Sequence, residues 1–155
     1  MRKQLLVSLL CCLLVSAASL AQSWKPYEQA AKGKTYEASD CVTLLDSTSV
    51  SVQPTGQGSF AVCKVIKVQT PRGAVDNRVI KYDYDPLTAY AEFKRVTIHH
   101  ANGKVDELDV RKTCDYAAPA RAIYWGARQI MLEIGALHPG DIVDYEIAKK
   151  GFTYA

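Results

Sequence analysis

Apolar and polar residues alternate with a period of two along most of this chain. Tyr82 and Tyr84, for example, alternate with Asp83 and Asp85, which is the pattern of a strand with one buried face. Gly, Pro and Asn residues separate these alternating runs. We therefore predict about seven strands, among them residues 40–45, 47–53, 60–70, 75–84, 90–100, 128–134 and 142–147.

The spacing of these runs predicts a mainly β fold. Helical crossovers between parallel strands are missing from the pattern, so we expect a two-layer antiparallel β-sandwich-like domain. A short N-terminal helix is expected within residues 23–33, because Pro26 suits a first helical turn and Gly33 can end it.

A hairpin is predicted around Asn102-Gly103, and the apolar pattern selects its register. A two-residue loop would place Val96 and Ile98 on the same face as acidic residues. A three-residue loop pairs His100 with Lys104 instead and gathers the apolar side chains of Val96, Ile98, Leu108 and Val110 on one face. We predict the three-residue loop, with Gly103 in the left-handed conformation.

The first 21 residues have the composition of a secretory signal peptide. Arg2 and Lys3 precede an apolar run at residues 5–15, and Ser19 and Ala21 form a cleavage site. This run is shorter than the ~20 residues of a membrane span. We predict export to the periplasm or the extracellular space, with residues 22–155 as a single β-rich domain. Cleavage lowers the net charge to about +1, which gives no electrostatic case for nucleic-acid binding.

Three cysteines remain after cleavage: Cys41, Cys63 and Cys114. Export permits a disulfide, but three thiols cannot all pair within one chain, and their strand-like surroundings favour free thiols. Cys114 lies in a less regular segment beside Arg111 and Lys112. Among the three cysteines, Cys114 is the best candidate for a nucleophile, so a thiol enzyme stays open as an alternative.

The other polar residues predict no catalytic, metal or cofactor site. His99 and His100 are adjacent on a strand and therefore point to opposite faces; we expect both to be exposed near the hairpin turn. His138 is expected to be solvated, as are Asp83 and Asp85. The sequence contains no phosphate-binding loop, zinc spacing or nucleophile elbow.

The densest group of aromatic and basic residues lies at residues 116–128. Such residues stack on sugars or anchor partners, although core packing is the alternative. We also predict that residues 128–134 and 142–147 form a C-terminal hairpin that meets a downstream domain, the alternative being that they close the domain's own core. The predicted partner-binding or glycan-binding residues are Arg121, Tyr124, Trp125, Arg128 and Tyr145.

Three blocks of the chain resemble a known bacterial family. They are VIKYDYDPLTAY at Val79–Tyr90, ARAIYWGARQ at Ala120–Gln129, and the segment from EIGALHPGDIVDYE to KKGFTYA at Glu133–Ala155. The chain is similar to a domain of unknown function that precedes transglutaminase-like domains in secreted proteins. The resemblance implies a β-rich, non-catalytic N-terminal module of a longer protein, whose Cys-His-Asp site lies downstream. No catalytic residue carries over to this chain.

We therefore expect an accessory or interaction domain of an exported transglutaminase-like protein, without enzymatic activity of its own. Its expected partner is the downstream transglutaminase-like domain or another protein. The aromatic and basic residues leave a glycan-binding β-sandwich module as the alternative. The thiol enzyme based on Cys114 is a third hypothesis.

Overall fold

The computed structural model describes residues 25–31, 38–118 and 126–152. The predicted signal peptide lies outside these residues. Helix α2 (Lys25–Ala31) belongs to a unit separate from residues 35–155. It confirms the predicted N-terminal helix, with Pro26 in its first turn. Among the described residues, no helix is long and apolar enough to cross a membrane.

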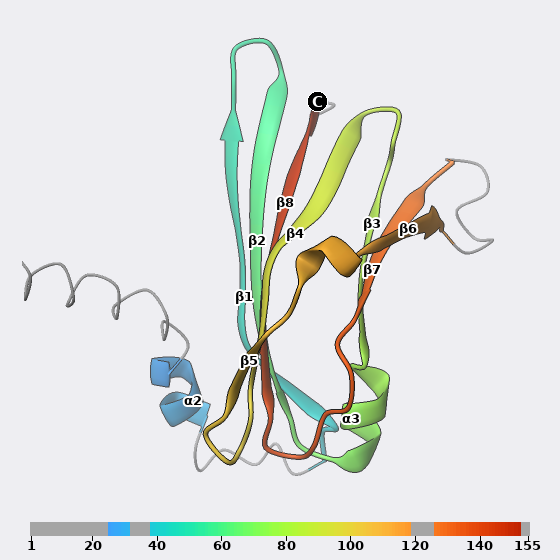
Figure 1. Cartoon of the computed structure of the whole chain (residues 1–155). Helices are drawn as coiled ribbons and strands as arrows, with labels where there is room; N and C mark the ends of the chain where they lie inside the picture. Colours follow the sequence, from blue (N-terminus) through green and yellow to red (C-terminus); the bar gives the residue numbers. More distant parts are fainter. Residues whose placement is uncertain (1–24, 32–37, 119–125, 153–155) are drawn as a thin grey trace, which may run out of the picture. The chain divides into compact units, whose positions relative to one another are not determined.

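The second unit is a sandwich of two antiparallel sheets, as the alternating pattern predicted (Figure 1). The larger sheet contains, in spatial order, β1 (Cys41–Val52), β2 (Gln57–Val68), β8 (Ile142–Phe152), β4 (Ala89–His99) and β5 (Val105–Glu107). The smaller sheet contains β3 (Val79–Tyr84), β7 (Arg128–Glu133) and β6 (Cys114–Ala117). The fold is therefore mainly β and sandwich-like.

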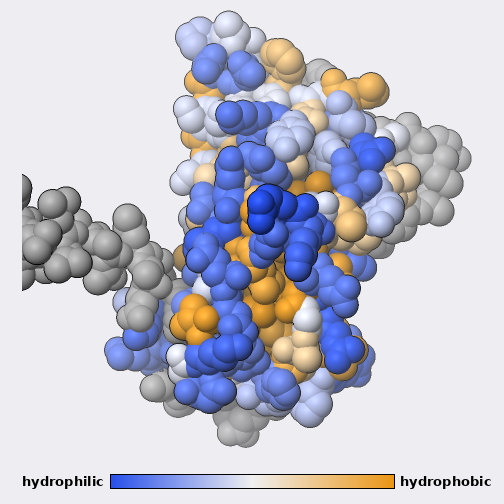
Figure 2. Space-filling model, in the orientation of Figure 1, coloured by the Kyte–Doolittle hydropathy of each residue, from blue (hydrophilic) through white to orange (hydrophobic). Residues whose placement is uncertain are grey.

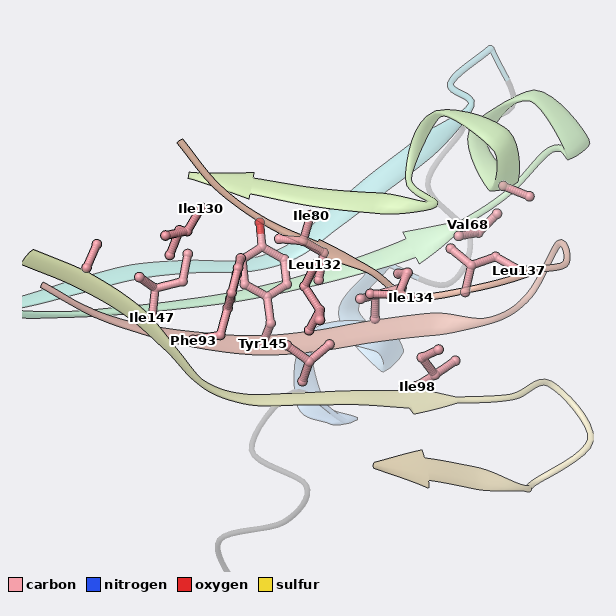
Figure 3. Packing of buried hydrophobic residues seen from close by; sticks show 14 of the residues in the cluster. Val68, Ile80, Phe93, Ile98, Ile130, Leu132, Ile134, Leu137, Tyr145 and Ile147 are labelled. Carbon is pink, nitrogen blue, oxygen red and sulfur yellow. The ribbon is translucent and has the colours of Figure 1, made fainter. Parts of the chain in front are cut away.

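The core lies between the two sheets and is formed by the alternating apolar residues. Strand β8 contributes Val143, Tyr145 and Ile147, and the β7 segment contributes Ile130, Leu132 and Ile134. Figure 3 shows Tyr145 packed with Phe93, Leu132 and Ile80 in this layer. Each fully buried aliphatic side chain contributes about 1.5–3 kcal/mol relative to an exposed one.

The predicted C-terminal hairpin is wrong, because β7 and β8 belong to different sheets. Strand β7 pairs with β3 and β6, whereas β8 pairs with β2 and β4. The intervening segment crosses between the sheets, with Gly135 and Gly140 at φ +86° and +95°. Tyr145 is only 9% exposed, so it is a core residue and is not available to a partner.

The β4–β5 hairpin confirms the predicted register. His99 pairs with Val105, the His100 N–H donates to the Lys104 carbonyl at 2.8 Å, and Gly103 has φ +88°. The pairing ends soon after Leu108, whose N–H donates to the Val96 carbonyl. The chain then enters a short 3-10 helix, η1 (Val110–Lys112).

Two further segments differ from the sequence-based expectation. Residues 41–52 form one strand, β1, with a β-bulge at Leu44, rather than the two strands predicted at residues 40–45 and 47–53. Residues 71–76 form a helix, α3 (Pro71–Asp76), where a strand had been expected to begin at residue 75. The Thr70 hydroxyl accepts the Gly73 N–H at 3.1 Å, so Thr70 and Pro71 begin this helix through an N-cap and a first-turn proline.

Candidate functional site

Strand β6 lies beside a concave surface of the domain. It pairs on one side with β7, so that Cys114 lies opposite Met131 and Ala117 lies opposite Arg128. All four of its residues are exposed. This segment had been expected to be irregular, because its sequence, CDYA, has no apolar alternation.

A groove of about 520 Å³ lies along β6. Its outer side chains follow from strand pairing, since Val79, Met131 and Glu133 alternate with buried residues on β3 and β7. Cys114 lies opposite Met131 on β6. We call this surface the β6 groove, defined by Val79, Lys112, Cys114, Tyr116, Met131 and Glu133. It therefore combines an apolar floor with an exposed tyrosine and two opposite charges.

A second hollow, of about 380 Å³, lies between β4 and η1. Strand β5 pairs with β4 only at Thr97–His99, so the earlier part of β4 has no strand on this side in the described chain. We call this surface the β4 hollow, defined by Tyr90, Glu92, Phe93, Val110, Arg111 and Ile130. Figure 2 shows an apolar strip close by, in the opening below η1.

Polar contacts hold β6 in place between these two hollows. The Tyr84 hydroxyl donates to Asp115 Oδ2 at 2.7 Å, and Arg128 Nε donates to Asp115 Oδ1 at 3.0 Å. Arg128 also donates to the Asp115 backbone carbonyl at 3.0 Å. Burial, and then the Asp115 carboxylate, raise the pKa of Tyr84. The three side chains therefore fix the position of β6 relative to β3 and β7 within the smaller sheet.

Residues 54–155 match the family model described as a domain of unknown function with a solved structure, DUF3857. The chain belongs to the DUF3857 family. The DUF3857 segment covers β2 to β8 and therefore includes every residue that defines the β6 groove and the β4 hollow. A search of curated proteins found no match.

Two solved structures resemble this DUF3857 chain. One, from Parabacteroides distasonis ATCC 8503, is described as a putative protease; it has a TM-score of 0.57 and 12% identity over 70% of this chain. The present chain covers 22% of that protein, and the likeness shows the fold alone. The other is the CBM3a-L domain with flanking linkers of the scaffoldin cipA from the cellulosome of Clostridium thermocellum. It has a TM-score of 0.43 and 11% identity, over 72% of this chain and 68% of that one.

The predicted binding residues of the DUF3857 domain do not form one described site. Arg121, Tyr124 and Trp125 lie outside the described residues. Arg128 lies on β7 and is engaged by Asp115, while Tyr145 is buried in the core. The groove residues Lys112, Met131 and Glu133 were missed, because the pairing of β6 with β7 that gathers them leaves no local signal in the sequence.

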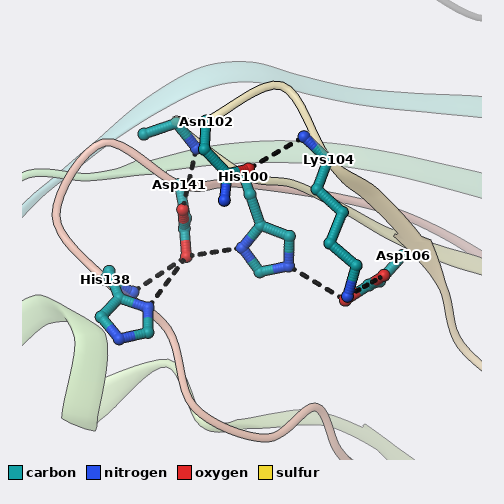
Figure 4. A network of polar contacts seen from close by, with 7 residues as sticks. His100, Asn102, Lys104, Asp106, His138 and Asp141 are labelled. Carbon is teal, nitrogen blue, oxygen red and sulfur yellow. Dashed lines mark hydrogen bonds and ion pairs between the residues drawn. The ribbon is translucent and has the colours of Figure 1, made fainter.

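The two adjacent histidines point to opposite faces, as predicted, but neither is exposed. Their side chains are each 17% exposed. His100 Nδ1 lies 3.1 Å from Asp141 and its Nε2 lies 3.1 Å from Asp106 (Figure 4). His99 lies 4.0 Å from Asp144 on the other face. The prediction of exposed histidines is wrong, because the 137–141 turn and β5 bring carboxylates against His100 and β8 brings Asp144 against His99.

His138 is 75% exposed, as predicted, and lies beside the same buried carboxylate of Asp141 (Figure 4). The Asp141 side chain accepts the backbone N–H groups of His138 and Ala101 at 2.9 and 3.1 Å. It therefore joins the turn before β8 to the β4–β5 turn. We interpret this network as a structural connection, since each of its polar contacts is satisfied within the domain.

The three described cysteines are free thiols, so the disulfide alternative is not observed for them. Burial raises the pKa of the Cys41 and Cys63 thiols, which disfavours the reactive thiolate. Cys114 is exposed in the β6 groove and interacts with the Tyr116 hydroxyl, whose pKa it raises. The described residues contain no group of three or more His, Cys, Asp or Glu side chains placed so that they could hold a metal ion.

Proposed function

We propose that this DUF3857 domain is a non-catalytic interaction module of an exported protein, and that a polypeptide segment of its partner occupies the β6 groove. The observation that carries the proposal is the groove itself. Its volume of about 520 Å³ and its apolar Val79 and Met131 suit buried side chains. Lys112 and Glu133 offer a charge of each sign to an extended segment.

The groove supports a polypeptide partner better than a catalytic reaction. Tyr116 is 55% exposed on the groove, where an aromatic side chain can anchor a partner. The contacts described for His99, His100 and His138 are with aspartates rather than with a cysteine. A cysteine nucleophile needs a base within hydrogen-bond reach, so these contacts favour recognition over catalysis.

The resemblance of the three sequence blocks favours a transglutaminase-like domain as the partner. The solved Parabacteroides distasonis chain, of which this domain's fold forms a minor part, shows that the fold occurs within a much longer protein. Export follows from the predicted signal peptide and its cleavage after Ala21. Mass spectrometry of the exported protein should find Gln22 at the N-terminus, and an intact Met1 would exclude the cleavage.

The binding experiment titrates the purified chain with a transglutaminase-like domain from a secreted bacterial protein in which the two domains adjoin. Met131→Glu and Tyr116→Ala should each weaken binding by about tenfold or more, as expected for anchor residues. Leu87→Lys is the matched control, because Leu87 is 87% exposed on the turn between β3 and β4. An unchanged dissociation constant in both groove variants would exclude the β6 groove as the binding site.

A glycan array and soluble polysaccharides test the alternative ligand class on the same surface. Glycan binding that is lost in Tyr116→Ala would show that the ligand of the β6 groove is a sugar rather than a polypeptide. Hydrolysis or transfer from a glutamine-donor peptide is the catalytic test. Turnover that disappears in Cys114→Ser would overturn the non-catalytic role.

A further inference from the structure

Strand β1 ends the larger sheet with a long and unprotected edge, visible at the left of the sheet in Figure 1. It spans twelve residues and pairs only with β2 in the described structure. Residues 46–52 are all exposed, and they include no Lys, Arg or Pro. The bulge that interrupts the strand lies earlier, between Thr43 and Leu45. The one charged side chain among residues 46–52 is Asp46, which is paired with Lys64 on β2. Long edges with so few charged residues readily pair with a further strand.

The other sheet edges have the protection that β1 lacks. Strand β5 has three residues and is bordered by the Lys104–Asp106 ion pair. Strand β6 has four residues, and the Arg128 side chain donates a hydrogen bond to the Asp115 carbonyl on it. Strand β3 carries the charged Lys81 and Asp83. Short length and charged side chains both discourage edge pairing, so β1 is the edge most suited to it.

The backbone groups that point away from the sheet can be assigned along β1. The Gln53 N–H donates to the Gln57 carbonyl at 2.8 Å, so Gln53 and every second residue before it bond to β2. Thr48, Val50 and Val52 therefore direct their N–H and C=O groups outward. Asp46, at the start of this series, forms an ion pair with Lys64 at 3.2 Å.

We propose that two copies of this chain associate through antiparallel pairing of their β1 edges, with the twofold axis at Ser49. This register pairs Thr48 with Val50 of the second copy and Asp46 with Val52. All outward backbone groups from residue 46 to residue 52 then find partners. The two larger sheets become one continuous sheet across the dimer.

Charge and side-chain chemistry select this arrangement over the alternatives. The two Asp46 carboxylates are separated by six residues along the paired strands, or about 20 Å, whereas an in-register parallel pair would place them side by side. The Thr48–Val50 pairs bring β-branched side chains together across the new ladder, which is favourable. Val50 and Val52, now 52% and 55% exposed, lose exposed apolar surface on association.

The first test measures the oligomeric state of the full chain by analytical ultracentrifugation over a concentration series. We expect a monomer–dimer equilibrium and loss of the dimer in Val50→Lys, which places a charge on the pairing edge. Val105→Lys is the matched control on the β5 edge, since Val105 is 55% exposed, and it should leave the dimer unchanged. A chain that stays monomeric at the highest concentration, or a dimer that survives Val50→Lys, overturns the proposal.

The second test reads the register and does not depend on how Val50→Lys folds. The background carries Cys114→Ser and also Cys63→Ser, because Cys63 pairs with residue 47 on β2 and would form an intrachain disulfide with a cysteine there. In this background, the twofold axis places the cysteine of Ser49→Cys directly opposite the same residue of the second copy. Ser47→Cys would instead face Ser51 of the second copy. Mild oxidation should therefore give rapid disulfide-linked dimers of the position-49 variant and few of the position-47 variant. Equal cross-linking at the two positions excludes the proposed register, and its absence at position 49 excludes the interface.

Discussion

Replacing Asp141 with alanine should destabilise the domain more than any other single change in its polar network. The carboxylate is 2% exposed and accepts the N–H groups of His138 and Ala101 as well as a hydrogen bond from His100. Truncation leaves two backbone donors and one imidazole nitrogen without this acceptor. Each buried group left unsatisfied costs about 1–3 kcal/mol.

The expected loss for Asp141→Ala is about 3–5 kcal/mol in the free energy of unfolding, the range found when one partner of a buried charged network is removed. Asp106→Ala is the control, because Asp106 contacts the same imidazole from a side chain that is 36% exposed. Its removal should leave the urea midpoint almost unchanged, as for exposed pairs. Both aspartates contact His100, so the difference in unfolding free energy between the two variants reports the contribution of the buried Asp141 carboxylate.

Urea unfolding followed by circular dichroism gives both free energies from midpoints and slopes. The slope should stay unchanged, since neither substitution alters the surface exposed on unfolding. A loss below about 1 kcal/mol for Asp141→Ala would show that water replaces the carboxylate without cost. The connection between the 137–141 turn and the β4–β5 turn would then contribute little to stability.

The same carboxylate predicts how stability depends on pH. Burial by itself raises the pKa of Asp141, but the hydrogen bonds from His138, Ala101 and His100 outweigh it, and the net pKa is lowered. A lowered folded-state pKa gives stability that is fully present above the unfolded value, about 3.9, and is lost as the pH falls through the folded value. The urea midpoint of the wild type should therefore fall below about pH 4, and that fall should be smaller in Asp141→Asn.

Three further outcomes test the fold and its surfaces. Gly103→Val should cost about 1–3 kcal/mol because the residue has φ +88°; an unchanged urea midpoint would remove the bulged-turn argument. In the native protein, iodoacetamide should alkylate Cys114 first and Cys41 slowly, because burial raises the pKa of the Cys41 thiol; peptide mass spectrometry measures the order, and faster labelling of Cys41 would contradict it. Tyr145→Lys should unfold the domain, as circular dichroism would show, because it places a charge at a 9% exposed position.

The alternating pattern was sufficient to assign the core-facing residues around β7 and β8, because successive side chains of a strand point to opposite faces of its sheet. Ile130, Leu132 and Ile134 lie on one buried face, and Val143, Tyr145 and Ile147 lie on another. The pattern could not assign partners, because a hairpin and a sheet-to-sheet crossing use the same apolar strands. Here the two sets of side chains form one core from opposite sheets.

The β6 groove depends on contacts that no local pattern contains. Strand β6 is short and polar, and its position follows from Asp115 contacts to Tyr84 and Arg128, which are 31 and 13 residues away in the chain. Met131 also belongs to an alternating strand, but on the face opposite the core. The sequence therefore predicted the strand that carries Met131 and not the groove it lines.

For the two histidines, the sequence predicted the direction of each side chain but not its burial. Adjacency on β4 determined that His99 and His100 point to opposite faces, and the structure confirms this. The low exposure of His100 depended instead on the turn that follows β7, because Asp141 reaches His100 from 41 residues away. The same turn carries the chain from the smaller sheet to the larger one, so the residue that covers His100 also ties the crossing to the β4–β5 turn. The buried Asp141 carboxylate thereby links the β4–β5 hairpin, which the sequence predicted correctly, to the segment between β7 and β8, which the sequence wrongly predicted as a hairpin turn.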